Sequence, residues 1–220
     1  MADERVPSTQ HAVQLVGPGR LALDTAKPVG PGRLVLNTAK SVGPGRLALN
    51  TDRPVGPIRP NTILAKVEAV GLCFSDLKLL KAFSAHPRKS EIVSGIPKTI
   101  LPDLAGYVPG ELPTVPGHEA VCRIVAVGGE VTRHAVGERV IVQTDYRSLR
   151  TAASNAAFGY NFEGALQEYV AMDERVVIDG ETGERFLIPV SEKLSASAAC
   201  LVEPWACVED SYISPERQSP

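Results

Sequence analysis

The sequence predicts a mainly β domain that curls into a partly open barrel with a few short helices. Several short strand-like segments precede one helical tail, an order typical of a curled β domain. The 18 prolines and 19 glycines, mixed with many valines, favour short strands and turns over a helical bundle. No strand followed by a Gly-x-Gly-x-x-Gly turn and a helix occurs, so the sequence predicts no nucleotide-binding unit of that type.

An internal repeat dominates the first quarter of the chain. Residues 1–10 are expected to form an N-terminal tail, and residues 11–60 a first strand followed by 13-residue tandem copies. The copies read VGPGRLALDTAKP (16–28), VGPGRLVLNTAKS (29–41) and VGPGRLALNTDRP (42–54), with a partial copy from Val55. Each copy joins a Gly-Pro-Gly turn to an alternating, strand-like RLxLxT, which is too short to bury a face of its own.

Two interpretations of the repeat stay open. One is a repetitive binding surface, and the other is a duplicated strand and turn at the edge of the domain. The short period favours the second interpretation. Because the copies are nearly identical, any of the RLxL segments fits the same place in a sheet, so the register is ambiguous.

After residue 60 the pattern is that of an ordinary globular domain. Alternating segments rich in β-branched residues predict strands at 62–70, 120–128, 138–143, 164–172 and 185–190. A helix is expected after Cys73, with Ser75 or Asp76 as its N-cap. Pro204 interrupts the helical tail and predicts two short helices that meet near Glu203.

Two stretches, 84–114 and 144–163, are expected to be irregular. The first is expected to be an excursion outside the core. Both are expected to shape a substrate pocket, because loops on a rigid scaffold commonly carry binding residues.

The charge balance and the lack of long apolar runs exclude several classes of protein. With 23 basic and 25 acidic residues the net charge is -2, so no nucleic-acid partner is expected. No apolar run approaches the about 18 residues of a membrane helix, and the first residues lack the order of a secretory signal. The four cysteines are then expected to be reduced thiols or metal ligands in a cytoplasmic protein.

Four residues that are far apart in the sequence fit a single metal site. Cys73 ends a predicted strand, His118 and Glu119 start another, and Glu203 lies at the helix break. Thiolate, imidazole and carboxylate together suit zinc, whose catalytic sites have three protein ligands and an open position. Each residue also has a plainer explanation, as a core thiol, a turn histidine or an exposed acid, and the spacing alone leaves both open.

Five segments between residues 55 and 212 carry recognisable motifs. They are GLCFSDLK (71–78), PTVPGHEAVCRIVAVGGEV (113–131), HAVGERV (134–140), GALQEYV (164–170) and LVEPWACV (201–208). In the same order and with about the same spacings, they resemble the GICGSD, GHE, VGDRV, GG-x-AEYV and EPLAC segments of the zinc-dependent medium-chain alcohol dehydrogenase/reductase family. The resemblance implies a GroES-like catalytic domain, assigned to residues 61–212, in an oxidoreductase that interconverts an alcohol and a carbonyl with NAD(P).

The resemblance also implies roles by position. Cys73 and His118 match two zinc ligands, Glu119 matches a ligand of the polyol- and sorbitol-dehydrogenase-like branch, and Glu203 matches a third ligand or a water-holding carboxylate. Asp76 matches the carboxylate that holds the zinc histidine, and Ser75 the hydroxyl that passes the substrate's proton outward. One zinc ion would polarise the oxygen of a small alcohol or carbonyl substrate, and a nicotinamide would carry the hydride.

The sequence departs from the family's pattern at several positions. Phe74 replaces a glycine, and Lys78 stands where many members have a relay histidine. Residues 144–163 hold no cysteine, so the family's four-cysteine structural zinc lobe is not expected. The remaining cysteines, Cys122, Cys200 and Cys207, match no ligand position and are expected to be packing residues.

The nucleotide-binding Rossmann domain of the family is expected to be missing. Residues 213–220 are expected to be a tail where that domain would start, so NAD or NADP is expected only if such a domain is supplied. A partner chain that carries it, or a homo-oligomer, is therefore expected, and no membrane partner. Two alternatives stay open, a non-catalytic zinc-binding module and a GroES-like assembly module.

Overall fold

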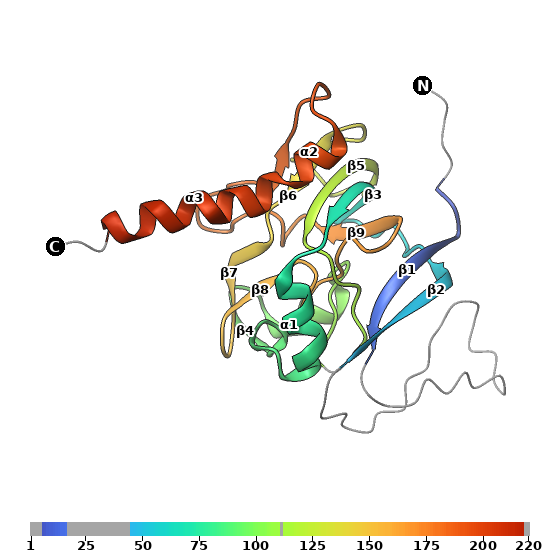
Figure 1. Ribbon diagram of the computed structural model, residues 1–220. Helices are drawn as coiled ribbons and strands as arrows, with labels where there is room; N and C mark the ends of the chain where they lie inside the picture. The colour runs from blue at the N-terminus through green and yellow to red at the C-terminus, as the bar shows by residue number, and fades with distance from the viewer. Residues whose placement is uncertain (1–5, 17–44, 111, 218–220) are drawn as a thin grey trace.

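The described residues form three antiparallel sheets, and the two larger ones make up the body of the molecule (Figure 1). The computed structural model describes residues 6–16, 45–110 and 112–217. The larger sheet has five strands, in the order β10, β6, β5, β3 and β9. Their bounds are Thr62–Gly71 for β3, Glu119–Val127 for β5, Arg139–Val142 for β6, Tyr169–Asp173 for β9 and Leu187–Pro189 for β10. The smaller sheet joins β4 (Ile92–Ser94), β7 (Asp145–Thr151) and β8 (Asn155–Ala157).

Side chains from both sheets form one hydrophobic core. Ile63 and Ile124 from the larger sheet, and Tyr146 and Phe158 near the smaller one, are each 1% exposed or less. Removing such side chains from water contributes about 25 cal/mol per Å² of apolar surface, which makes this core the main stabilising element. Among the described residues the sheets form no closed barrel. The predicted fold class, mainly β and partly open with few helices, is confirmed.

The predicted strands of the larger sheet are present, with shifted ends in two cases. β3, β5 and β6 agree with the predictions, whereas β9 and β10 start at Tyr169 and Leu187, later than predicted. The prediction that 144–163 is irregular is wrong, because this stretch contains β7 and β8. A bulge in the pairing of β7 with β8 places the two core-facing residues Tyr146 and Leu149 three positions apart, which hides the alternation that predicts a strand.

The stretch 84–114 is also more ordered than predicted. It contains β4 and two 3₁₀ helices, η2 (Pro87–Lys89) and η3 (Lys98–Asp103), and a third, η1 (Phe83–Ala85), starts just before it. Leu101 and Leu104 belong to the main core. The prediction of an excursion outside the core is therefore wrong for these residues.

The third repeat copy supplies a strand. β1 (Thr9–Val16) pairs antiparallel with β2 (Arg46–Pro54), which confirms the strand-like character of that copy. Residues 17–41 of the first two copies lie outside the described residues. Leu47 and Leu49 of β2 are 52% and 66% exposed, so β2 lies at the edge of the domain.

Specific side chains fix the register of β2. Arg53 donates hydrogen bonds to Glu163 at 2.8 and 3.2 Å and to Gln167 at 3.1 Å. Asn50 donates to Gln14 of β1 at 3.1 Å. The first copy has aspartate and lysine at these two repeat positions, and the second has asparagine and lysine. Arg53 is therefore the contact that distinguishes the third copy from both others.

Three α-helices complete the part of the chain that the structure describes: α1 (Phe74–Ala82), α2 (Ala196–Cys200) and α3 (Val202–Arg217). The prediction of two helices in the tail is confirmed, but the prediction that two short helices meet near Glu203 at Pro204 is wrong, because they meet at Leu201 and α3 has 16 residues. Pro204 is the third residue of α3, where the helix leaves an amide unpaired in any case, so the proline does not interrupt it. α3 extends away from the sheets (Figure 1). None of the described helices combines the length and the apolar character needed to cross a membrane.

Candidate metal centre

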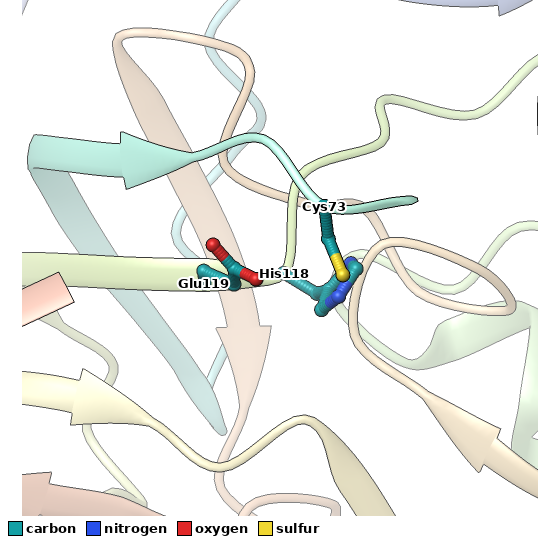
Figure 2. Close-up of side chains that lie close together, drawn as sticks. All are labelled: Cys73, His118 and Glu119. Atoms are coloured by element: carbon teal, nitrogen blue, oxygen red, sulfur yellow. The ribbon is translucent and has the colours of Figure 1, made fainter. Parts of the chain in front are cut away.

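Three of the predicted metal ligands meet where β3 ends and β5 begins. Cys73 follows β3 by two residues, His118 precedes β5, and Glu119 is its first residue. Because β3 and β5 are antiparallel neighbours, these ends lie side by side. One donor atom from each side chain lies within 4.8 Å of the other two (Figure 2). His118 and Glu119 are 4% and 5% exposed, so the structure holds both polar side chains out of water.

The start of α1 positions Cys73. Cys73 is the N-cap residue of α1, and its amide donates a hydrogen bond to Oδ2 of Asp76 at 3.0 Å. The predicted N-cap, Ser75 or Asp76, is therefore wrong by two or three residues. Asp76 lies in the first turn of the helix, where a carboxylate can accept a hydrogen bond from a backbone amide that has no partner within the helix.

Asp76 also binds the segment that carries His118. Its Oδ1 accepts a hydrogen bond from the Gly117 amide at 3.2 Å and lies 3.4 Å from Nδ1 of His118. The second distance is long for a hydrogen bond, and no other described residue offers Nδ1 a partner. Gly117 has a φ of +92°, a conformation that favours glycine, so the turn before His118 depends on it. Asp76 is thus both part of the helix cap and the carboxylate beside the histidine.

Gly71 makes room for the carboxylate of Glu119. The two residues are paired in the β3–β5 ladder. A Cβ atom on Gly71 would lie 2.1 Å from Oε2 of Glu119 and 3.0 Å from its Cβ. A larger residue at position 71 would therefore displace the carboxylate. Sequence reasoning did not single out Gly71, because a glycine at the end of a strand is ordinary.

Ser75 lies between the thiol and the imidazole. Its Oγ is 3.0 Å from Sγ of Cys73 and 3.1 Å from Nε2 of His118. A hydroxyl carries one hydrogen, so it cannot donate to both atoms at the same time. The ring of Tyr160 lies 5.8 Å from the ring of His118 and forms a further wall.

The charges around His118 favour a cation at this place. Burial by itself would lower the pKa of His118. The carboxylate of Asp76, together with Cys73 and Glu203, outweighs burial and raises the pKa to about 9. Burial would likewise raise the pKa of Asp76, but its contacts with His118 and with the amides of Cys73 and Gly117 lower it. Surroundings that stabilise a protonated imidazole also suit a metal ion.

Glu203 reaches the same cavity from the helical side. The cavity has a volume of about 700 Å³ and is lined by Glu203 as well as by Cys73, His118 and Glu119. The carboxylate of Glu203 is not part of the group whose donor atoms lie within 4.8 Å of one another. Burial raises the pKa of Glu203, and the neighbouring Glu119 adds to this effect while His118 opposes it.

Part of the cavity wall comes from the two stretches that were predicted to be irregular. Arg88, Asp145 and Tyr160 line the cavity, and Nη1 of Arg88 donates to Asp145 at 3.0 Å. The motifs did not point to these residues, because their segments approach the site only after folding.

The other cysteines divide into two kinds. Cys122 and Cys200 are 0% and 6% exposed and pack in hydrophobic clusters, as expected. Cys207 is exposed and lines the cavity, 3.7 Å from Oε1 of Glu203. The expectation that Cys207 is a packing residue is therefore wrong.

The donor set is one that zinc accepts. Sulfur, nitrogen and carboxylate oxygen are all common zinc donors, and a site with three protein donors that faces a cavity leaves a position for a further ligand. Asp76 lies beside Nδ1 of His118, so Nε2 is the ring nitrogen left for a metal, and this arrangement orients the ring as in many metal sites. The residues present fit zinc.

Comparisons with known proteins agree on one family. Residues 59–181 match the family model described as the alcohol dehydrogenase GroES-like domain. Sorbitol dehydrogenase of Bacillus subtilis strain 168 is 30% identical over 161 residues, which cover 68% of this chain and 37% of the relative. The chain thus spans well under half the length of this curated relative.

Solved structures share the fold at low sequence identity. A short chain alcohol dehydrogenase from E. coli CFT073, complexed with NADH, has a TM-score of 0.53 at 17% identity, over 90% of this chain and 43% of that chain. Acetophenone reductase from Geotrichum candidum NBRC 4597, in complex with NAD, has a TM-score of 0.50 at 20% identity, over 90% of this chain and 45% of that chain. At these identities the likeness supports the fold alone.

Proposed function

Because the chain belongs to the alcohol dehydrogenase GroES-like domain family, we propose that it is the catalytic-domain portion of a zinc-dependent alcohol or polyol dehydrogenase. The reaction would interconvert a small alcohol and its carbonyl with NAD(P). The observation that carries this proposal is the convergence of Cys73, His118 and Glu119 beside a cavity. Sorbitol dehydrogenase as a relative favours a polyol among the alcohols.

The three convergent side chains would hold the zinc ion. When bound, zinc polarises the oxygen of an alcohol or carbonyl and lowers the pKa of the alcohol. Glu203 lines the same cavity as these ligands, where it would act as a further ligand or hold a water molecule. Asp76 would keep the ring of His118 in place through its contact with Nδ1.

Ser75 would accept and pass on the proton of the substrate hydroxyl. Its Oγ already contacts both Cys73 and His118, so a hydroxyl of the substrate next to these ligands lies within its reach. Because Lys78 replaces the relay histidine of the family, the onward path of the proton would differ from the usual one.

The hydride would come from or go to a nicotinamide held by a nucleotide-binding domain. We infer that such a domain, on a partner chain or elsewhere in the same protein, is required for turnover, since the sequence has no Gly-x-Gly-x-x-Gly unit between a strand and a helix. A homo-oligomer is compatible with this requirement. All four cysteines are free thiols, which supports a reducing compartment such as the cytoplasm.

Metal analysis of the purified chain tests the zinc site. About one zinc ion per chain is expected after dialysis, and Cys73→Ser and His118→Asn are expected to lose it. Cys207→Ser is the matched control, because Cys207 lines the same cavity outside the group of three donors, and it should keep the zinc. If Cys73→Ser retained its metal, the ligand assignment would be wrong.

A second candidate function, an assembly module, is favoured by the exposed leucines of β2, Leu47 and Leu49. Intact folding without any bound zinc would support this candidate. Zinc binding without sorbitol oxidation, even when a nucleotide-binding domain is added, would instead support a non-catalytic zinc-binding module. Formation of reduced nicotinamide with sorbitol would support the dehydrogenase.

A further inference from the structure

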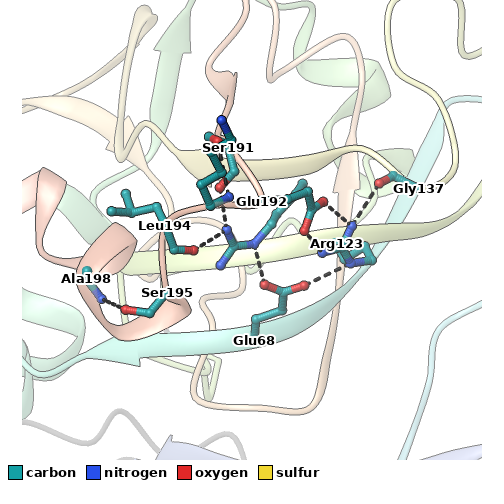
Figure 3. A network of polar contacts seen from close by, with 10 residues as sticks. Glu68, Arg123, Gly137, Ser191, Glu192, Leu194, Ser195 and Ala198 are labelled. Carbon is teal, nitrogen blue, oxygen red and sulfur yellow. Dashed lines mark hydrogen bonds and ion pairs between the residues drawn. The ribbon is translucent and has the colours of Figure 1, made fainter.

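One glutamate lies between two arginines that face each other across neighbouring strands. Arg123 of β5 pairs with Arg139 of β6, and like charges at such positions repel. Oε1 of Glu68 accepts a hydrogen bond from Nε of Arg123 at 2.9 Å, and Oε2 accepts one from Nε of Arg139 at 2.6 Å (Figure 3). The side chain of Arg139 is only 5% exposed, so its charge depends on this carboxylate.

A bulge in β3 aims Glu68 at the arginines. The register of β3 against β5 shifts between Val67 and Ala69, which leaves Glu68 as the extra residue. Such bulges turn a side chain away from the regular alternation and are common next to functional sites. Glu68 lies five residues before Cys73 on the segment that leads to the metal centre.

Arg139 also holds the turn that precedes α2. Its Nη1 donates to the carbonyl oxygens of Ser191 at 2.8 Å and Leu194 at 2.7 Å. The Leu194 amide donates to Ser191 at 3.2 Å and closes the turn. Ser195 comes next, and its hydroxyl accepts a hydrogen bond from the Ala198 amide at 3.2 Å as the N-cap of α2. The guanidinium therefore fixes the place where α2 begins.

α2 connects this turn to the metal centre. Ala199 and Cys200 pack against Val121 and Ile141 of the larger sheet. Only Leu201 separates α2 from α3, and Glu203 is the second residue of α3. The contacts that fix the turn thus reach Glu203 through one short helix.

We propose that Arg139, held by Glu68, is a positioning residue that sets where Glu203 stands relative to Cys73, His118 and Glu119. The ion pair joins the two walls of the cavity, because β3 leads from Glu68 to Cys73 and the turn and α2 lead from Arg139 to Glu203. Arg139 itself does not line the cavity. The inference rests on the proposed function insofar as the three side chains bind a metal.

A double-mutant cycle on zinc affinity tests this coupling. Arg139→Lys keeps the charge but lacks the planar fork that bonds Glu68 and two carbonyl groups together. Arg139→Lys and Glu203→Gln are each expected to weaken zinc binding about tenfold, and the double variant no further, because both act through the same carboxylate. Independent losses that multiply to about a hundredfold would overturn the proposal, as would an unchanged affinity in Glu203→Gln.

Arg123→Lys is the matched control. Arg123 shares the Glu68 carboxylate and bonds the exposed side chain of Glu192 in the turn and the carbonyl of Gly137, but it does not bond the backbone carbonyls of Ser191 and Leu194. It is expected to keep the affinity of the wild-type chain. An equal loss in Arg123→Lys would mean that the bonds of Arg139 to the two turn carbonyls are not what positions Glu203, which would overturn the proposal.

The absorption spectrum of the cobalt-substituted chain separates positioning from stability. If Arg139 positions Glu203, Arg139→Lys shifts the visible bands in the same direction as Glu203→Gln. A purely structural role would lower the melting temperature and leave the bands unchanged, which would overturn the proposal. Should Arg139→Lys fail to fold, Ser195→Ala replaces it. This variant removes the exposed N-cap of α2 and so loosens the same start of the helix. Its effect on zinc affinity should show the same non-additivity with Glu203→Gln.

Trp205 gives a readout that needs no metal. It is the chain's single tryptophan and lies on α3, two residues after Glu203. Faster nanosecond depolarisation of its fluorescence is expected in Arg139→Lys but not in Arg123→Lys. If the wild-type chain bound no metal and this difference were seen, the proposed function would fail while the placement of α3 by Arg139 would stand. Equal anisotropy in both variants would overturn the placement itself.

Discussion

The two walls of the cavity are built in different ways. On the strand wall, His118 and Glu119 are buried, and Asp76 ties their segment to the start of α1. On the helix wall, Glu203 lies on α3, where Trp205 and Tyr212 are 70% and 75% exposed. The strand wall is fixed by ladder register and by a shared carboxylate, whereas the helix wall is held through α2 with its preceding turn and through contacts of α3 with β5. A metal centre of this kind has one rigid half and one half that its supports can adjust.

The largest effect is expected from breaking the strand wall at Asp76. Asp76→Ala removes the acceptor of two backbone amides and the charged neighbour of His118. We expect the free energy of unfolding to fall by about 3 kcal/mol and zinc affinity to fall about 10- to 100-fold. Denaturant unfolding and zinc titration measure the two quantities.

Asp52→Ala on β2 is the control for the removal of a carboxylate. Asp52 is exposed, and a change of less than about 0.5 kcal/mol is expected. A loss of stability in Asp76→Ala no larger than that of the control would contradict the role of Asp76 in the strand wall.

A smaller effect is expected from crowding the same wall at Gly71. The added methyl group of Gly71→Ala would meet the carboxylate of Glu119, which must then move, while the rest of the fold can remain. Zinc affinity is expected to fall about tenfold with little change in far-ultraviolet circular dichroism. Gly129→Ala serves as control, since a Cβ there meets no atom within 4 Å. An unchanged zinc affinity in Gly71→Ala would show that Glu119 is not a ligand.

A buried histidine outside the metal centre, His134, allows the comparison to be tested by the pH dependence of stability. Nδ1 of His134 lies 2.8 Å from Glu174, and its Nε2 is buried without a partner among the described residues. Burial, reinforced by Arg185, outweighs Glu174 and lowers the pKa of His134, the opposite direction from His118. Because the folded chain favours the neutral imidazole, its contribution to stability is complete above the unfolded pKa of about 6.5 and is lost as the pH falls through the folded pKa.

In the metal-free chain the raised pKa of His118 favours the folded state at low pH and opposes this effect, so the contribution of His134 is measured by comparison with His134→Gln. The variant has no ring to titrate at this position, so on going from about pH 7.5 to about pH 5 the melting temperature of the wild-type chain should fall further, or rise less, than that of His134→Gln. Titration of the His134 ring above about pH 6.5, followed by nuclear magnetic resonance, would contradict this account.

The smallest effect is expected on the outer face of the helix wall. Trp205 is 70% exposed, so Trp205→Ala removes little buried surface. The free energy of unfolding should change by less than about 0.5 kcal/mol and zinc affinity not at all. Thermal unfolding and zinc titration check both. A large loss in either would mean that the side chain of Trp205 supports the site.

The sequence predicted the strand wall better than the helix wall or the cavity. Cys73, His118 and Glu119 lie in local motifs at strand ends. Antiparallel pairing brings such ends together independently of the conformation of the loops. Gly71 and Glu68 were not predicted, because a close approach and a bulge become visible only when two strands are aligned. Arg88 and Tyr160 line the cavity but come from stretches whose structure depends on packing against distant parts of the chain. The periodicity of a single segment does not predict such packing.

The charged side chains of Glu68, Arg123 and Arg139 also limit how this surface can change in sequence. With Glu68 replaced by a neutral residue, Arg123 and Arg139 would face each other with no counter-charge from β3. A single substitution of the acid is then harmful, while its simultaneous replacement with both arginines by apolar residues of similar volume is tolerable for folding. Related sequences are therefore expected to keep or lose these three residues as a set, and redesign of the surface has to treat them as one unit.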